Sequence, residues 1–391
     1  MPILSIVIPT HNRSHYAIPT IKSILTISKD IQVVVSDSSE IDLLTPTFKY
    51  LNENSRLKII RHTGVVSVVD NFNAALNAAD GDYVAFIGDD DFVSCDILTL
   101  TKWAKSNNID SLKLNFPVFY YWPDYKHASR GQFYAGTLQI SPFTGVIEQH
   151  KTLEPFFHAL ENFGGGVFDM PRAYAGIISS SLANKIVDKY GELFGGVSPD
   201  IYSSALIANE SSNCVSVDFP VVIPGASGKS TAGQSAAGGH RGKLRDNPHI
   251  AAFQTLVWDI RIPEFYSVPT VWSFSLLRAL EKLAKKNPKL VIKPNFSRLI
   301  LKCLIYHPAE YKATLISLLF LLRNQGVFKT SLKFTKAVYS EFKWGLFRIR
   351  NRFISRHVKN NVKIIKDLDD TLAARKALQK YISACGVILK Y

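Results

Sequence analysis

The sequence has 391 residues, 47% hydrophobic and 20% charged, so it can bury a substantial core and is neither disordered nor fibrous. The formal net charge of +14 is unevenly distributed: residues 272–391 contain 25 Lys and Arg against 6 Asp and Glu, whereas residues 1–271 contain 21 against 26. A slightly acidic front part and a strongly basic back part predict a catalytic or binding domain with a basic appendage.

No segment of the sequence indicates export or a membrane span. The four cysteines are scattered, without the CxxC pairs of a zinc ribbon and without the density of a disulfide scaffold. The first five residues lack the charged and apolar regions of a secretory signal. The longest apolar stretch, residues 313–322, has ten residues, whereas a helix that crosses a bilayer needs about 20. We therefore expect a reduced, cytoplasmic protein.

Strands and helices alternate over the first 90 residues. Short apolar runs rich in β-branched residues predict strands, and apolar residues at helical spacing predict the helices between them. The expected strands are 4–8, 31–35, 57–60 and 83–87, and the expected helices are 15–28 and 66–79. This order predicts a mostly parallel sheet with right-handed crossovers, in which ligands bind beyond the carboxyl ends of the strands.

The pattern is less regular after residue 110. Aromatic strands are expected over 112–122 and 132–140, followed by a helix near 148–161. Residues 225–242 are rich in Gly, Ser and Ala and nearly free of large apolar side chains, which predicts a mobile loop. Beyond about residue 270 the sequence becomes helical, aromatic and basic.

Polar residues follow three of the expected strands. The first strand leads into residues 9–13, the second into residues 36–39, and the fourth into Asp89, Asp90 and Asp91. Three acids at the end of a buried strand repel one another unless a positive group binds them. Clustered carboxylate oxygens suit Mg²⁺ or Mn²⁺, which commonly also hold a substrate diphosphate. The alternative is an acidic, solvated turn.

Four segments resemble, in order and spacing, the motifs of the family 2 glycosyltransferases, which have the GT-A fold. They are residues 5–13, 33–39, 70–76 and 81–91. The resemblance covers about residues 3–100 closely and extends loosely to about 220. It implies a Rossmann-like GT-A domain over residues 1–235, a loop or connector over 236–271, and a basic α-helical region over 272–391. Members of this kind build bacterial surface polysaccharides.

The resemblance also implies roles for the residues at the strand ends. Pro9, Thr10, Asn12 and Arg13 would line the pocket of the nucleotide-sugar, and Asp37 would accept a hydrogen bond from the base, most often uracil. Asp91 would be the main metal ligand, while Asp89 and Asp90 would share the ribose contact and the second metal contact. The sequence departs from the family at Gly88, where many members have an acid.

An inverting transfer needs a base that takes the proton of the acceptor hydroxyl, and a carboxylate can serve. The position that matches the family is Asp200. Pro199 predicts that a helix begins here, so Asp200 would lie near a helix N-terminus. The alternative role is an ordinary acid at a helix start. Many members have Glu where this sequence has Pro199.

Cations in the loop that follows are further candidates for donor binding. Lys229, His240 and Arg241 lie in or beside residues 225–242 and would close over the diphosphate as a lid, unless the loop is simply solvated. Gly228-Lys229-Ser230 has the last part of a P-loop, but position 223 is Ile where that motif needs Gly.

The basic region contains a segment, residues 343–354, in which aromatic and cationic residues alternate. It predicts an amphipathic helix that suits an anionic membrane surface. The alternative is the solvated face of a helical bundle. No helix-turn-helix, RNP or zinc pattern accompanies it, so no nucleic-acid partner is expected.

The sequence as a whole predicts a metal-dependent, inverting glycosyltransferase that uses Mn²⁺ or Mg²⁺ and a UDP-linked donor. Its acceptor would be a hydroxyl of a growing glycan on a polyprenyl-diphosphate carrier, reached through peripheral contact with the inner face of the cytoplasmic membrane. Three alternatives remain open: transfer of the sugar to a polyprenyl phosphate, a nucleotidyltransferase, and a non-catalytic basic protein that binds membranes or nucleic acid.

Overall fold

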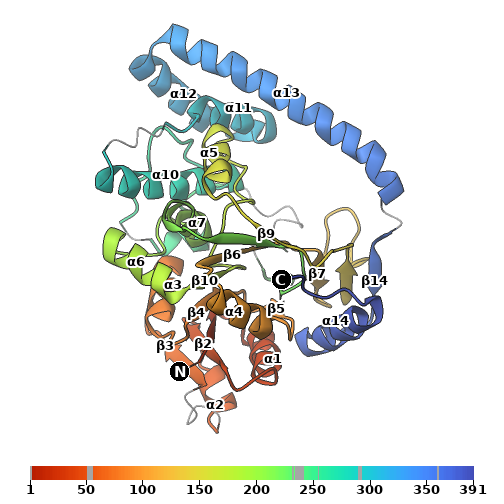
Figure 1. The fold of residues 1–391 in the computed structure, drawn as a ribbon. Helices are drawn as coiled ribbons and strands as arrows, with labels where there is room; N and C mark the ends of the chain where they lie inside the picture. Colours follow the sequence, from red (N-terminus) through yellow and green to blue (C-terminus); the bar gives the residue numbers. More distant parts are fainter. Residues whose placement is uncertain are drawn as a thin grey trace.

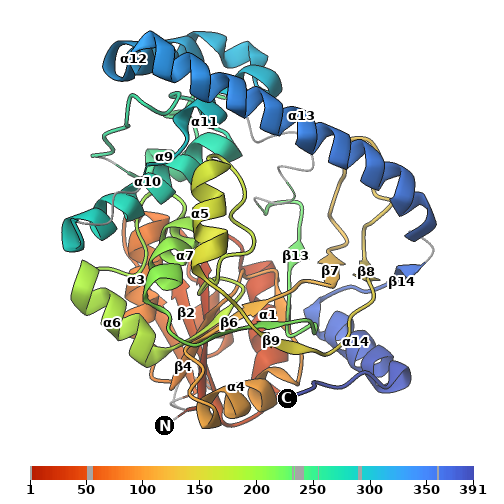
Figure 2. The same cartoon turned by 45° about the horizontal axis from the view of Figure 1, so that its top comes forward.

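The protein has an α/β part, a group of helices beside it, and a long helix that runs along one side of the molecule (Figures 1 and 2). The segment after this helix returns to the α/β part. The computed structural model describes residues 2–50, 56–230, 233, 242–253, 255–288, 293–358 and 361–391.

An eight-stranded sheet with the order β3-β2-β1-β4-β10-β6-β11-β9 forms the centre of the α/β part. Its strands are β1 (Leu4–Thr10), β2 (Ile31–Asp37), β3 (Leu57–Arg61), β4 (Tyr83–Phe86), β6 (Ser111–Leu114), β9 (Ile147–Gln149), β10 (Ile177–Ser179) and β11 (Cys214–Val217). The first four strands pair in parallel, as expected from the sequence. Only β10 and β9 pair antiparallel with their neighbours in this sheet, so the expected mostly parallel sheet is confirmed.

Side chains alternate between the two faces of the sheet along each strand, so the core has two layers, one on each face. Ile6 and Ile8 of β1 pack into one layer together with helix α1, whereas Val7 packs into the other together with helix α3. Successive side chains of a strand point to opposite faces, and both faces are covered here. The apolar runs of the sequence are therefore continuous because each strand supplies both layers.

Helices α1, α3 and α5 lie close to the expected helices 15–28, 66–79 and 148–161. The helices of the α/β part are α1 (Ser14–Leu25), α2 (Leu44–Thr47), α3 (Val68–Asn77), α4 (Ile97–Ser106), α5 (Leu153–Glu161), α6 (Ser180–Tyr190) and α7 (Pro199–Glu210). Those that follow are α9 (Pro248–Ala251), α10 (Val268–Lys286), α11 (Phe296–Tyr306), the 3-10 turn η1 (Pro308–Glu310), α12 (Tyr311–Gln325), α13 (Val327–Val358) and α14 (Thr371–Cys385). Helix α10 packs along α7, which joins the helical group to the layer that α3 covers.

Two small sheets extend the α/β part. One joins β5 (Phe92–Val93) to β12 (Val222–Ile223), and the other has the order β13-β7-β8-β14. Its strands are β7 (Val118–Tyr121), β8 (Thr137–Ile140), β13 (Gly225–Ala226) and β14 (Lys363–Ile365). Strand β8 is shorter than the expected strand 132–140, because residues 132–136 form turns that end at Gly136, whose φ is +63°.

Residues 363–391 return from the basic region to the α/β part. Strand β14 pairs with β8, and α14 packs against α1. Leu378 and Ile382 of α14 are buried in the same layer as α1, where a fully buried side chain of this size contributes about 1.5–3 kcal/mol. The backbone N–H of Lys390 donates to the carbonyl of Gly145 at 2.8 Å. The basic region thus consists of helices α10–α13 and a segment that completes the front part.

Within the part of the chain that the structure describes, no helix combines the length and the apolar character needed to cross a membrane.

Candidate active site

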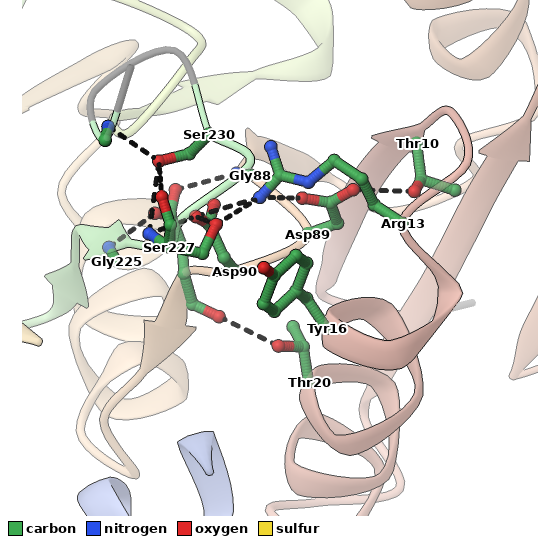
Figure 3. Close-up of polar contacts among 12 residues, drawn as sticks. Thr10, Arg13, Tyr16, Thr20, Gly88, Asp89, Asp90, Gly225, Ser227 and Ser230 are labelled. Carbon is green, nitrogen blue, oxygen red and sulfur yellow. Dashed lines mark hydrogen bonds and ion pairs between the residues drawn. The ribbon is translucent and has the colours of Figure 1, made fainter. Parts of the chain in front are cut away.

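The three aspartates after β4 are buried at the carboxyl end of the sheet. Asp89, Asp90 and Asp91 are each no more than 5% exposed. Thr10, at the end of β1, donates from Oγ1 to Oδ2 of Asp89 at 2.6 Å. Ser227, just after β13, donates from Oγ to Oδ2 of Asp90 at 2.6 Å. Residues from three distant parts of the sequence therefore meet around this triplet (Figure 3).

Arg13 is the cation that faces the triplet. Its Nη2 atom lies 3.0 Å from Oδ1 of Asp89 and 2.9 Å from Oδ2 of Asp90, as Figure 3 shows. Burial on its own lowers the pKa of Arg13, but the charges of the two aspartates raise it above its ordinary value. In this structure the positive group between the two carboxylates is the guanidinium of Arg13.

Asp91 has a different environment from the other two aspartates. Its Oδ2 accepts the backbone N–H of Gly88 at 2.7 Å, and its Oδ1 accepts the backbone N–H of Gly225 at 2.7 Å. Burial raises the pKa of the Asp91 carboxyl, and the nearby charge of Asp90 raises it further. A Cβ atom on Gly225 would lie 1.8 Å from the carbonyl oxygen of Asp90, so only glycine allows β13 to approach this closely.

The carboxylate oxygens of Asp89, Asp90 and Asp91 are the type of ligand that a hard divalent cation prefers. In this structure the guanidinium of Arg13 stands in for such a cation beside Asp89 and Asp90. Asp89 and Asp90 are the carboxylates that share this stand-in. Asp91, expected to be the main ligand, has both oxygens engaged with backbone donors. Among the residues described, no group of three or more His, Cys, Asp or Glu side chains is arranged as a ready-made metal site.

The predicted base-binding residue, Asp37, lies at the end of β2 and is 1% exposed. Nη1 of Arg61 donates to its Oδ2 at 2.8 Å, and the backbone N–H of Ser39 donates to its Oδ1 at 2.8 Å. Asn12 has a φ of +55°, which Asn tolerates better than most residues, and its backbone N–H donates to Oγ of Ser39 at 2.7 Å. The loop after β1 is therefore tied to the loop after β2.

Asn71 is a nearby residue to which the sequence analysis gave no role. It lies on α3, is 5% exposed, and its Nδ2 donates to Oγ of Ser38 at 3.4 Å. Its buried Oδ1 has no hydrogen-bond partner within the described part of the chain. An unpaired buried oxygen beside the predicted base pocket is a candidate contact for a ligand donor.

Asp200 lies in the first turn of α7 and is half-buried, and Oγ of Ser198 donates to its Oδ1 at 2.9 Å. The guanidinium of Arg172 lies within range of its charge and donates from Nη2 to the carbonyl of Phe168 at 2.9 Å. Burial lowers the pKa of Arg172, and Asp200 partly offsets this effect.

Tyr174 lies within electrostatic range of both the triplet and Asp200. Burial and the charges of Asp91, Asp90, Asp89 and Asp200 together raise the pKa of its hydroxyl well above its usual value. That hydroxyl lies 2.9 Å from the point where a Cβ atom on Gly88 would stand. Gly88 therefore leaves room for Tyr174 beside the triplet, which explains locally why glycine stands there.

The remaining predicted residues are less defined. Pro9 is half-buried within β1. Lys229 is exposed. Burial is the main cause that lowers the pKa of His15, and the positive charge of Lys229 lowers it further. His240 and Arg241 lie outside the described residues. Within residues 225–230, Ser227 and Ser230 are buried and Ser227 contacts Asp90, whereas Gly228 and Lys229 are exposed.

A separate cleft of about 820 Å³ opens between α3, α7 and α10. Asp70, Glu192, Tyr202 and Lys282 are among its lining residues. None of the predicted site residues lines it. The polar ends of the strands, rather than this cleft, thus form the candidate active site.

A mostly parallel α/β sheet with buried carboxylates beyond β4 defines the GT-A class of fold. Residues 5–160 match the family model of glycosyl transferase family 2. The chain therefore contains a family 2 glycosyltransferase domain over these residues, and it is a glycosyltransferase of the nucleotide-sugar type. A search of curated proteins found no match.

Solved structures of TarS from S. aureus resemble this chain. The fragment 1–349 in complex with UDP-GlcNAc is 16% identical, with a TM-score of 0.45, over 88% of this chain and 92% of the fragment. The same fragment in complex with UDP is 17% identical, with a TM-score of 0.40, over 81% of this chain and 88% of the fragment. A longer TarS structure is 18% identical, with a TM-score of 0.40, over 59% of this chain, and the match spans 37% of that longer chain.

Proposed function

We propose that the protein transfers a sugar, with inversion, from a UDP-linked donor to a hydroxyl group of a glycan. The observation that carries the proposal is that the buried hydroxyl of Tyr174 lies within electrostatic range of both the strand-end carboxylates and Asp200. In an open α/β sheet a nucleotide binds beyond the carboxyl ends of the strands. A donor bound there would have its sugar directed toward Asp200.

Each group has a distinct role in this proposal. Asp37 accepts a hydrogen bond from the base, and Pro9, Thr10, Asn12 and Arg13 line the nucleotide pocket. Asp89, with Asp90 or Asp91, holds Mn²⁺ or Mg²⁺, which would supply positive charge opposite the leaving diphosphate. Lys229, His240 and Arg241 are predicted to add further positive charge beside the diphosphate.

Asp200 takes the proton of the acceptor hydroxyl in this scheme. General-base catalysis of this kind contributes about 10²–10⁴-fold to the rate. A polyprenyl phosphate acceptor is already ionised and needs no such base. The behaviour of an Asp200 variant therefore separates a glycan hydroxyl from a polyprenyl phosphate as the acceptor.

The test compares the wild type with Asp200→Asn, and with Asp188→Asn, which alters an exposed acid of α6. UDP binding is measured by calorimetry with and without Mn²⁺, and sugar transfer is measured as UDP release from UDP-glucose, UDP-galactose and UDP-N-acetylglucosamine with a membrane extract as acceptor. We expect Asp200→Asn to bind UDP normally and to lose at least about 100-fold in rate.

Unchanged transfer by Asp200→Asn would refute the role of this residue and favour a polyprenyl phosphate acceptor. Release of pyrophosphate in place of UDP would favour a nucleotidyltransferase. If no nucleotide binds under any condition, the proposed donor site is wrong.

The acceptor in this proposal is carried by a polyprenyl diphosphate, so the enzyme works at the cytoplasmic face of a membrane. Helices α12 and α13 support this part of the proposal. Residues 311–350 contain eight Lys and Arg and one acid, Glu341, which is buried and paired with Arg298. Apolar residues on the same helices are exposed, among them Ile316, Phe328 and Phe342 at 57%, 85% and 63%.

An anionic lipid surface matches these two properties. It accepts exposed apolar side chains and attracts Lys and Arg. A second copy of the chain would bring one basic helix against another, and the like charges would repel each other. We therefore propose that α12 and α13 rest on anionic lipid.

A further inference from the structure

The guanidinium of Arg13 lies where a cation is expected in the candidate active site. A single nitrogen, Nη2, contacts both Asp89 and Asp90, and it also donates to Oγ of Ser227 at 2.8 Å. Figure 3 shows these contacts converging between the end of β4 and the start of α1. A positive group between two carboxylates reproduces the charge arrangement that a bound divalent cation makes.

Local structure maintains Arg13 in this position without using all of its donors. Arg13 is the N-cap residue of α1, and its guanidinium carbon lies 4.9 Å from the centre of the Tyr16 ring. The side chain is 19% exposed. Its buried Nε–H has no hydrogen-bond partner within the described part of the chain. A guanidinium has five N–H donors, so Arg13 retains capacity for an oxygen-rich anion.

We propose that Arg13 and a divalent cation compete for Asp89 and Asp90, and that Arg13 moves to the donor's diphosphate when the nucleotide binds. This inference rests on the proposed function. Two positive groups cannot share the carboxylate pair without strong mutual repulsion in a buried site. A diphosphate offers the displaced guanidinium a new partner, to which it can donate through two N–H groups at once.

Ser227 belongs to the same network and stabilises the contact of Arg13 with Asp89 and Asp90. Its Oγ accepts from Arg13 and donates to Asp90, and its backbone N–H lies 3.2 Å from the same carboxylate oxygen. When Arg13 leaves Asp89 and Asp90, its hydrogen bond to Ser227, which joins the start of α1 to the residues after β13, is therefore also broken. The release of Arg13 couples cation binding to nucleotide binding, and such coupling acts equally in both directions.

The coupling has a measurable consequence for Mn²⁺ in the absence of nucleotide. In the wild type, Mn²⁺ alone must displace Arg13 without a replacement partner for the guanidinium, so its affinity is low. In Arg13→Met the competitor is absent, and we expect Mn²⁺ to bind at least about tenfold more tightly, which corresponds to about 1.4 kcal/mol. Saturating UDP raises the Mn²⁺ affinity of the wild type more than that of the variant.

Electron paramagnetic resonance of free Mn²⁺, titrated against the full chain with and without UDP, measures both effects. The matched control is Lys126→Met, which removes an exposed positive charge two residues from Asp124, whose carboxylate accepts the backbone N–H of Gly228. Screening by solvent makes the effect of this exposed charge small. An equal gain in Mn²⁺ affinity in Arg13→Met and Lys126→Met would overturn the proposal, as would no gain in Arg13→Met.

Ser227→Ala provides the answer if Arg13→Met does not fold. This variant keeps the guanidinium but removes the hydroxyl that donates to Oδ2 of Asp90, so we expect a smaller gain, about threefold, in Mn²⁺ affinity. An unchanged or lower affinity in Ser227→Ala contradicts the proposal. If the wild type binds no UDP, the proposed donor fails, whereas the Mn²⁺ titrations still decide whether Arg13 competes for Asp89 and Asp90.

Discussion

Asp37 and Arg61 form an ion pair in which the carboxylate is almost fully buried and the guanidinium is partly exposed. The pair connects the ends of β2 and β3 beside the predicted base pocket. A buried carboxylate is tolerated only when hydrogen bonds and opposite charge replace its hydration. The pair therefore stabilises the strand ends and holds the Asp37 carboxylate in position before any nucleotide arrives.

Arg61→Met tests this role. The variant leaves the Asp37 carboxylate with the donors of Ser39 but without its ion-pair partner. We expect the free energy of unfolding to fall by about 2 kcal/mol, since a buried charge is left unpaired. Urea unfolding measures the change. The double variant Asp37→Asn with Arg61→Met should recover part of the loss, and purely additive losses would show that the two side chains do not interact.

Residues that follow strands could be predicted from the sequence, and residues that arrive from distant loops could not. Thr10, Asp37 and Asp89 stand directly beyond apolar runs whose ends meet at one edge of the sheet. Ser227 lies 137 positions from Asp90, and serine in a Gly- and Ala-rich stretch carries no pattern that indicates a buried contact. Tyr174 depends on the chain path between α5 and β10, which no local periodicity reveals.

The beginning of helix α7 determines the position of Asp200. Pro199 stands in the first turn, where its missing N–H costs no hydrogen bond, and the preceding loop donates from Val197 and Ser198 to Oγ of Ser275 on α10. Nε2 of His249 lies 2.7 Å from the carbonyl of Val197 and donates to it. His249 is thus a positioning residue for the loop that leads to Asp200.

His249 also predicts a dependence of stability on pH. Burial lowers its pKa, while the carbonyl of Val197 and the charge of Asp200 oppose this effect. The folded protein therefore binds fewer protons at His249 than the unfolded chain, whose histidine has a pKa of about 6.5. The neutral form of His249 in the folded protein therefore contributes to the free energy of unfolding above about pH 6.5, and this contribution is lost as the pH falls through and below that value.

Urea unfolding of the wild type and of His249→Gln between pH 5 and pH 8 measures this contribution. Glutamine keeps a donor for the carbonyl of Val197 and does not titrate. We expect the difference in unfolding free energy between the two proteins to change across the pH range, with the wild type losing more toward pH 5. Parallel pH profiles would show that His249 does not titrate differently in the folded state.

At the scale of elements, apolar periodicity predicted the first four strands and helices α1 and α3, because these elements pack against neighbours in sequence. It did not predict α2, which has four residues. Strands β9 and β10 have three residues each, too few to show a period. The return of β14 and α14 could not be predicted either, because composition does not distinguish this basic segment from the basic helices before it.

The proposed membrane contact is a property of the whole molecule, since α12 and α13 lie along one side of it (Figures 1 and 2). We expect the protein to sediment with vesicles of phosphatidylcholine and phosphatidylglycerol, and less with phosphatidylcholine alone. Added salt should weaken the interaction. The triple variant Phe328→Ser, Phe342→Ser and Phe347→Ser should reduce binding at least about tenfold, because it removes three exposed aromatic rings.

Phe133→Ser is the matched control, because Phe133 is 63% exposed but lies between β7 and β8, outside α12 and α13. Binding should be unchanged in this variant. Equal sedimentation with both vesicle types, or equal loss in the control and the triple variant, would argue against the proposed lipid contact.

The return of residues 363–391 also governs the order in which the protein is completed during synthesis. A ribosome adds about 5–20 residues per second, so synthesis of residues 268–391, from α10 through α14, takes on the order of ten seconds. Throughout that interval one side of α1 lacks the cover of α14, and β8 has an open edge. The basic helices therefore leave the ribosome before the catalytic domain is finished, and nascent chains must keep an unpaired strand edge from aggregating until then.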